Sequence, residues 1–155
     1  MPKLLAALIL ALVAIAPAAW AKDFKATLSG DQEVPPVVTD TTGKFKLHLN
    51  KDETEGEITL TVRDGVRISR AHLHCAPVGV NGPIVLFLVG DNLAGYEVDG
   101  KWISNAVVTD ANIINPACGA TIADLADAMR AGNVYVNVHS VASPGGVVRG
   151  QVEAD

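Results

Sequence analysis

The sequence predicts an all-β fold, an antiparallel β-sandwich or Greek-key-like barrel with one short helix. Beyond residue 23, most of the chain alternates apolar and polar residues with a period of two, which is typical of strands that bury one face. Turn-forming Gly, Pro, Asn and Asp residues interrupt these runs at regular intervals. Only one segment carries a convincing helix pattern. Many short strands with a single helix point to a sandwich or a barrel.

The first expected strands span residues 24–28, 44–49 and 57–62, where apolar residues occupy every second position. The polar segment 50–56 joins the second and third of these runs and predicts a hairpin. The proline-containing stretch 33–37 is expected to be extended, because proline fixes its own φ and restricts the residue before it.

The middle of the chain predicts two further strands. Residues 63–65 form a break, after which residues 68–75 are expected to be extended. The continuous apolar run 84–89 indicates a strand buried on both faces. Residues 90–105 are mixed in character and receive no assignment, although a loop or a short hairpin there would need to pack Tyr96 and Trp102.

The C-terminal part contains the helix and two more strands. Thr121 fits an N-cap, with Asp124 three residues on, and Gly132 is a stop signal after an apolar stripe. A helix of this length suits a cover over one end of a sheet. Residues 133–139 return to strict alternation, and the last strand is expected at 147–152 after a Pro-Gly-Gly turn.

Residues 1–21 have the features of a secretory signal peptide. Lys3 supplies a positive charge, residues 4–17 are apolar, and residues 19–21 form a small-x-small cleavage signal. An uncleaved anchor is disfavoured, because a membrane-spanning helix needs about 20 apolar residues. The mature chain, residues 22–155, is expected to form a single domain that is periplasmic or secreted.

The charge of the mature chain is acidic. Without Lys3, 11 Lys and Arg residues stand against 17 Asp and Glu, which gives a net charge of −6. Nucleic acids and anionic lipids both require a basic surface, so neither is expected as a partner. No membrane association is predicted after cleavage of the signal.

The mature chain contains two cysteines, Cys75 and Cys118. An oxidising compartment favours their pairing, and a disulfide closing this loop would stabilise the fold by roughly 3 to 4 kcal/mol. The alternative is ligation of a metal by Cys75, because it directly follows His74. Adjacent strand residues point to opposite faces, which favours the disulfide.

Two histidines lie two residues apart in the expected strand 68–75. Residues i and i+2 of a strand share a face, so His72 and His74 should project together. His139 ends another strand, on the face opposite its valines, and all three imidazoles can share one surface. Neutral imidazole is a common ligand of copper and zinc, so this pattern predicts a metal site. Alternatively, His72 and His74 are ordinary solvent-facing strand residues and His139 is a turn-capping side chain.

Other polar residues are candidates with weaker support. Surface decoration is the favoured interpretation of His48, because two lysines flank it. Glu33 is a candidate oxygen ligand, although acidic residues in loops are usually only solvated. Arg149, on a polar strand face, could hold a small anion beside a metal, or it could be an exposed ion-pair partner.

Several stretches together resemble the CHRD domain, named after chordin. They are, in order, residues 28–36 (LSGDQEVPP), 71–74 (AHLH), 79–83 (GVNGP), 130–139 (RAGNVYVNVH) and 144–151 (PGGVVRGQ). The resemblance runs from about Phe24 to Val152. It implies that His72, His74 and His139 form a set, since the family pattern includes these positions but usually not His48. The two cysteines are not part of that pattern, and the family does not imply one activity.

The candidate residues are also similar, as a constellation, to the copper site of copper,zinc superoxide dismutases. That likeness implies a copper ion held by the three histidines, with an open position for superoxide and Arg149 guiding the anion. The sequence thus predicts an exported copper-binding protein, with zinc as the alternative metal and superoxide dismutation as the candidate reaction. A noncatalytic periplasmic copper carrier or buffer, and a metal-free extracellular protein-binding module, are the alternatives. The fourth ligand stays open between Glu33, His48, water and none, and the sequence does not identify a protein partner.

Overall fold

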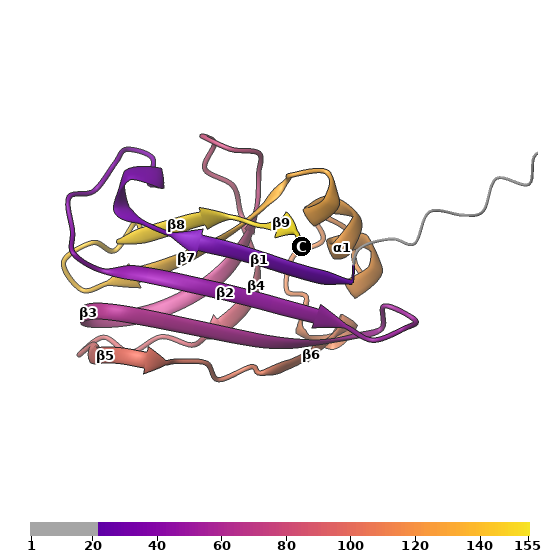
Figure 1. The fold of residues 1–155 in the computed structure, drawn as a ribbon, viewed down its shortest axis with the longest axis horizontal. Coiled ribbons are helices and arrows are strands. Elements are labelled where there is room, and N and C mark those ends of the chain that lie inside the picture. The colour runs from indigo at the N-terminus through magenta and orange to yellow at the C-terminus, as the bar shows by residue number, and fades with distance from the viewer. Residues whose placement is uncertain (1–21) are drawn as a thin grey trace, which may run out of the picture.

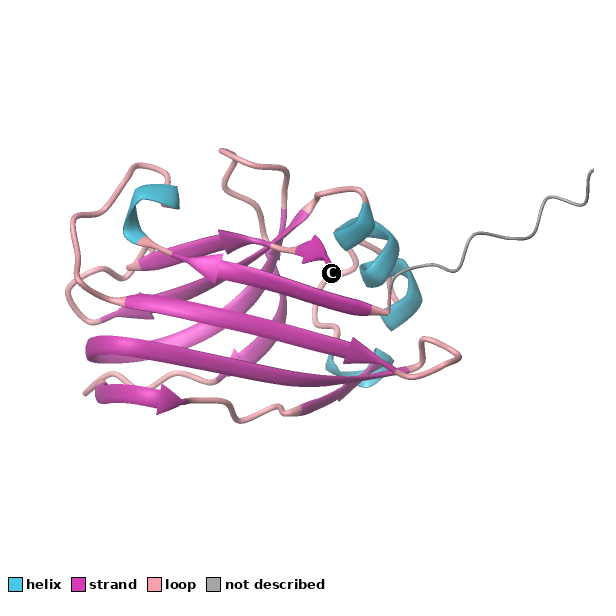
Figure 2. Ribbon diagram, in the orientation of Figure 1, coloured by secondary structure: helices cyan, strands magenta, loops and turns pink. Residues whose placement is uncertain are grey.

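The computed structural model describes residues 22–155, so the expected signal peptide at residues 1–21 lies outside the described residues. Strands make up most of the regular secondary structure of the described chain (Figure 1, Figure 2). Its elements are β1 (Asp23–Leu28), the 3-10 helix η1 (Gly30–Gln32), β2 (Thr42–Leu49), β3 (Glu55–Cys75), β4 (Ile84–Val89), β5 (Tyr96–Lys101), β6 (Val107–Thr109), the 3-10 helix η2 (Asp110–Asn112), α1 (Ile122–Arg130), β7 (Val134–Ser140), β8 (Val148–Gln151) and β9 (Glu153–Ala154).

The strands form one antiparallel sheet that is nearly closed into a barrel. Its order is β8-β7-β3-β2-β1-β9, and β4, β5 and β6 also pair with β3. The ends of β1 and β8 meet where Ser29 and Arg149 exchange two backbone hydrogen bonds, of 3.0 and 3.1 Å. Closure protects the edges of a sheet from pairing with other chains. The predicted all-β fold with one short α-helix is confirmed for the described residues.

β3 is a single bent strand, and the expected break at residues 63–65 was wrong. Its first half pairs with β2, and its second half pairs with β4 and β7. Between these halves, Asp64 and Arg67 adopt positive φ values of 52° and 48°, and the register to β5 shifts. Bulges of this kind bend a strand without ending its pairing. β3 thereby leaves the hairpin with β2 and crosses to the other side of the barrel.

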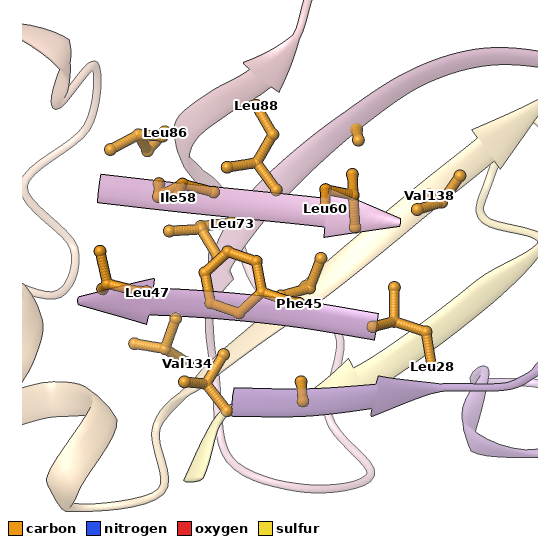
Figure 3. Close-up of a cluster of buried hydrophobic side chains, with 14 of the residues drawn as sticks. Leu28, Phe45, Leu47, Ile58, Leu60, Leu73, Leu86, Leu88, Val134 and Val138 are labelled. Carbon is orange, nitrogen blue, oxygen red and sulfur yellow. The ribbon is translucent and has the colours of Figure 1, made fainter. Parts of the chain in front are cut away.

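The inner faces of the strands pack into one hydrophobic core. β1 and β2 alternate strictly between exposed and buried residues, as the period-two pattern predicts. In Figure 3, Phe45 and Leu60 from the front strands meet Leu73 and Val138 from the strands behind them. Burying a side chain of this size contributes about 1.5 to 3 kcal/mol. The continuous run of β4 is mostly buried, as expected, although Ile84 and Phe87 are only partly so.

The helix α1 covers one end of the barrel, beside β9 and the start of β1 (Figure 1). Thr121 caps it: its side chain accepts a hydrogen bond from Asp124 N at 3.1 Å, and the Asp124 carboxylate accepts one from Thr121 N. The stripe with Leu125 and Met129 is buried in the core. Within residues 22–155, no helix has the length and apolar character needed to span a membrane.

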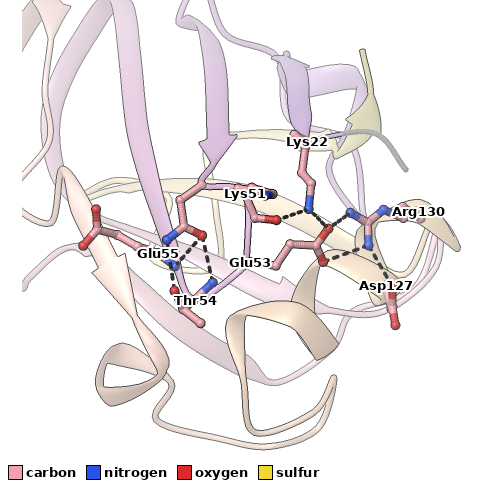
Figure 4. A network of polar contacts seen from close by, with 8 residues as sticks. Lys22, Lys51, Glu53, Thr54, Glu55, Asp127 and Arg130 are labelled. Carbon is pink, nitrogen blue, oxygen red and sulfur yellow. Dashed lines mark hydrogen bonds and ion pairs between the residues drawn. The ribbon is translucent and has the colours of Figure 1, made fainter. Parts of the chain in front are cut away.

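A polar network ties α1 to the turn between β2 and β3 (Figure 4). The Arg130 guanidinium donates from both Nη atoms to the Glu53 carboxylate, at 2.7 and 3.3 Å. Lys22 donates to the same carboxylate, and Asp127 accepts from Arg130 within the helix. These cations lower the pKa of Glu53, mainly through the hydrogen bond from Arg130.

Cys75 and Cys118 form a disulfide, which confirms the predicted pairing. Their Cα atoms are 5.6 Å apart, and the bond links the end of β3 to the segment before α1. Both cysteines pack against the core cluster, on the side of β3 away from its histidines. Ligation of a metal by a Cys75 thiolate is therefore not available in this fold.

Residues 90–105 form β5 and its flanking loops, where the centres of the Tyr96 and Trp102 rings lie 6.4 Å apart.

Candidate metal centre

His72, His74 and His139 converge on the outer face of the sheet. Each offers one ring nitrogen to a group whose atoms all lie within 4.8 Å of one another. His72 Nδ1 and His139 Nε2 are 3.1 Å apart. Asn137 of β7 lies directly opposite His72, and residues two apart on a strand share a face, so His139 projects on the same face as His72. The sequence-predicted ligand set is thus brought together.

The three imidazoles are buried, unlike ordinary polar surface residues. Their exposed fractions are 1% for His72, 7% for His74 and 5% for His139. The loops 76–83 and 141–147 lie against them and contribute backbone carbonyls. The face that carries these histidines is therefore a second, polar interior of the molecule.

Two backbone carbonyls fix the tautomers of the cluster. His74 Nδ1 donates to Gly82 O at 2.9 Å, and His139 Nδ1 donates to Pro144 O at 3.0 Å. With Nδ1 protonated, the lone pair of each of these two rings is on Nε2. His139 Nε2 therefore accepts a hydrogen bond from His72 Nδ1 at 3.1 Å, which places the lone pair of His72 on Nε2 as well. Nε2 of His72 and of His74 are buried and have no hydrogen-bond partner among the described residues. Buried nitrogen atoms usually have a hydrogen-bond partner. Two without one fit the role of metal-binding atoms.

Burial keeps the three imidazoles neutral. Desolvation lowers the pKa of His72 to about 3 and that of His139 to about 4, and it also lowers the pKa of His74. Neighbouring cationic charge contributes further, since Arg70 lowers the pKa of both His72 and His139. A neutral imidazole is the form that binds a metal, so no proton has to be displaced near neutral pH.

The candidate fourth ligands do not join the cluster. His48 is exposed on β2 and pairs with Asp23 at 2.7 Å. Glu33 is buried, but its carboxylate accepts a hydrogen bond from Asn137 Nδ2 at 2.6 Å. Within residues 22–155, the three histidines are the only group of His, Cys, Asp or Glu side chains close enough to hold a metal. The protein ligands are therefore all nitrogen atoms.

Glu33 belongs to the polar interior beside the cluster. Burial raises its pKa to about 7, against the opposing effects of Asn137 and Arg149. Gly146, with a φ of 136°, lies so close that a Cβ there would overlap Glu33 Oε1 and the Asn137 amide. The small residue at this position lets the loop 141–147 close over the Glu33–Asn137 pair.

Arg149 contacts the histidine cluster indirectly, through the ring of Tyr135. Its Cζ lies 3.5 Å from the centre of the Tyr135 ring, and that ring stacks on His74 with centres 4.7 Å apart. The guanidinium donates to Asn81 Oδ1 at 3.0 Å and to Val80 O at 2.7 Å. Arg149 is only 2% exposed. These contacts hold the loop 76–83 in place, whereas the predicted role of Arg149 as an anion guide stays a prediction.

Sequence reasoning gave no role to Arg70, Tyr135 or Asn137, although all three lie on the same face as the histidines. Arg70 is opposite His139 in the register of β3 and β7, and Tyr135 is opposite His74. The signal was present in the sequence, because Arg70 precedes His72 by two residues.

The comparison with protein families agrees with the predicted resemblance. The model of the CHRD domain matches residues 24–152, from β1 to the residue after β8. The chain belongs to the CHRD domain family. The matched residues of this CHRD domain include all three histidines of the cluster. No curated protein and no solved structure matches the chain.

Proposed function

We propose that this CHRD domain protein binds one copper ion through His72, His74 and His139 in an exported compartment. One observation carries the proposal: three neutral, buried imidazoles face one another, and two have unpartnered Nε2 atoms. Carbonyl groups already orient two of the rings, as second-layer partners commonly do around metal-bound histidine. The Cys75–Cys118 disulfide supports the exported compartment, because such bonds persist where the environment is oxidising.

Copper is favoured over zinc by the chemistry of the donor set. Both metals accept imidazole, but divalent copper binds more tightly than divalent zinc to a given nitrogen site. Structural zinc sites usually contain four protein ligands, often with thiolates. The histidine cluster has three nitrogen ligands and no thiolate. Zinc remains the alternative metal, because catalytic zinc sites use three protein ligands and three histidines are one such set.

Superoxide dismutation is the reaction that we propose for the copper-loaded protein. Copper would supply a one-electron redox couple, and three protein ligands leave room for a small anion at the metal. The chain's own contribution is to orient the imidazoles and to keep them unprotonated. A second candidate, a noncatalytic copper carrier or buffer, is supported by the burial of all three histidines, since burial restricts access from solvent.

Copper binding can be tested with the full chain and two single variants. We expect one copper per chain by metal analysis, with an electron paramagnetic resonance spectrum typical of nitrogen ligands. His72→Ala should lower the affinity at least about 100-fold, because it removes a ligand. His48→Ala is the matched control, since it changes an exposed histidine outside the cluster. Equal copper affinity in His72→Ala and wild type would exclude this site.

A superoxide assay on the copper-loaded chain then separates the two candidate uses. We expect a rate above that of free copper at the same concentration, and loss of the excess rate in His72→Ala. If the loaded protein is no faster than free copper, the dismutase proposal fails and the carrier remains. If the chain takes up no copper in the first experiment, both candidates fail.

A further inference from the structure

Arg70, His72 and His74 form a line of side chains on one face of β3. They occupy alternate positions of the same strand, opposite His139, Asn137 and Tyr135 of β7. Each of the three has a buried nitrogen without a hydrogen-bond partner among the described residues. These atoms are Arg70 Nε, His72 Nε2 and His74 Nε2. The unpartnered imidazole nitrogens suit a metal, but the guanidinium N–H is a donor and suits an anion.

The Arg70 side chain is fixed beside His139. Its Nη2 donates to Pro144 O at 3.1 Å, and the same carbonyl accepts the hydrogen bond from His139 Nδ1 at 3.0 Å. Its Nη1 donates to Asp91 Oδ1 at 3.3 Å. One carbonyl thus positions a candidate metal ligand and a cation together, without using all of the guanidinium donors.

A small cleft leads from solvent to this guanidinium. Its volume is about 150 Å³, and Arg70, Asp91, Ser140 and Pro144 are among the residues that line it. A cleft of this volume holds several water molecules, so it also accommodates an anion of two or three atoms.

The two arginines near the cluster differ in access. The Arg70 side chain is 33% exposed, whereas Arg149 is 2% exposed and donates from both Nη atoms to the loop 76–83. Arg149 also stacks on Tyr135. An anion arriving from solvent therefore meets Arg70 first.

We infer that Arg70 binds a small inorganic anion in the cleft beside His139 and thereby favours the binding of that anion at the metal. This inference rests on the proposed function, because it supplies the anion subsite of the same centre. Asp91 competes for the guanidinium, so the anion must displace or share that contact. Asp91 thereby sets how tightly Arg70 holds an anion.

The experiment uses azide as the probe and the copper-loaded full chain. Azide is titrated while its charge-transfer absorption and the electron paramagnetic resonance spectrum are recorded. Arg70→Ala should weaken azide binding about fivefold to tenfold at low salt, with unchanged copper stoichiometry, and Arg70→Lys should recover part of the loss. Arg63→Ala is the matched control, because this arginine lies on the same strand but pairs with Asp99, away from the cluster.

Asp91→Asn tests the same subsite without altering Arg70. It removes the competing negative charge, so azide should bind about threefold to fivefold more tightly than to wild type. If Arg70→Ala does not fold, this variant alone decides. Azide affinities equal to wild type in Arg70→Ala, or in Asp91→Asn, would overturn the role of Arg70 and leave copper binding intact. A wild-type chain without copper would overturn the inference together with the proposed function.

Discussion

At the scale of single residues, the buried histidines determine how the metal-free protein responds to acid. The pKa values of His72 and His139 are about 3 and about 4 in the folded chain, whereas histidine in an unfolded chain titrates near 6.5. Between these values the unfolded chain binds more protons than the folded chain, so stability falls as the pH falls. Glu33 acts in the opposite sense, because its folded pKa of about 7 favours protonation of the folded state.

We therefore expect the free energy of unfolding of the metal-free protein to drop between pH 6.5 and pH 4. Three histidines outweigh one carboxyl group, and the loss should be on the order of a few kcal/mol. Urea denaturation at several pH values measures it. His72→Gln should flatten the dependence, whereas His48→Gln, which alters an exposed side chain, should not. A wild-type stability that stays constant over this range would contradict the expectation.

At the scale of elements, the contact between α1 and the β2–β3 turn depends on Glu53. This carboxylate and Arg130 are each 15% exposed, and the pair is bidentate. Glu53→Gln should lower the free energy of unfolding by about 1 to 2 kcal/mol at pH 7. The pKa of Glu53 is lowered in the fold, so its contribution exists above the unfolded value and is lost as the pH falls through the folded value.

The deficit of Glu53→Gln relative to wild type should therefore shrink in acid. Glu57→Gln is the matched control, because it removes an exposed carboxylate of β3 that makes no ion pair among the described residues. Denaturation at pH 7 and pH 3 separates the two variants. A deficit of the same size at both pH values would mean that the charge of Glu53 does not matter.

Most individual strands could be predicted from the sequence, because each has a period of two that survives in isolation. The bend of β3 could not, since Asp64-Gly65 has the same composition as a turn that ends a strand. Only the pairing with β5 and the bulges show that the strand continues. Local turn chemistry and nonlocal pairing conflicted here, and pairing prevailed.

The strand face on which each histidine lies was predictable, because it depends only on the alternation of side chains along a strand. Spacing placed His72 and His74 on one face, and the alternation of β7 placed His139 on a compatible face. Burial of these residues was not predictable, because the loop 76–83 that covers them has no periodic pattern. The Gly82 carbonyl that orients His74 is likewise a backbone group, which no residue type reveals.

At the scale of the whole molecule, the disulfide should affect stability far more than it affects the candidate metal centre. Replacing both Cys75 and Cys118 by serine should lower the free energy of unfolding by about 3 to 4 kcal/mol, as expected for a loop of this length. Copper stoichiometry should remain that of wild type, because Cys75 packs against the core while His74 faces away from it. Urea denaturation and metal analysis on the same sample test both statements, and a variant that folds but takes up no copper would contradict the second.

The length of β3 has a further consequence for the molecule. The single strand β3 contributes Ile58 and Leu60 to the hydrophobic core, and His72 and His74 to the histidine cluster. A fluctuation that opens the histidine face must therefore pull on the strand that also holds β2, β5 and β6. The two halves of the barrel are mechanically coupled, so they should open as one cooperative unit. A ligand bound at the histidines would then slow hydrogen exchange in a hairpin that it never touches.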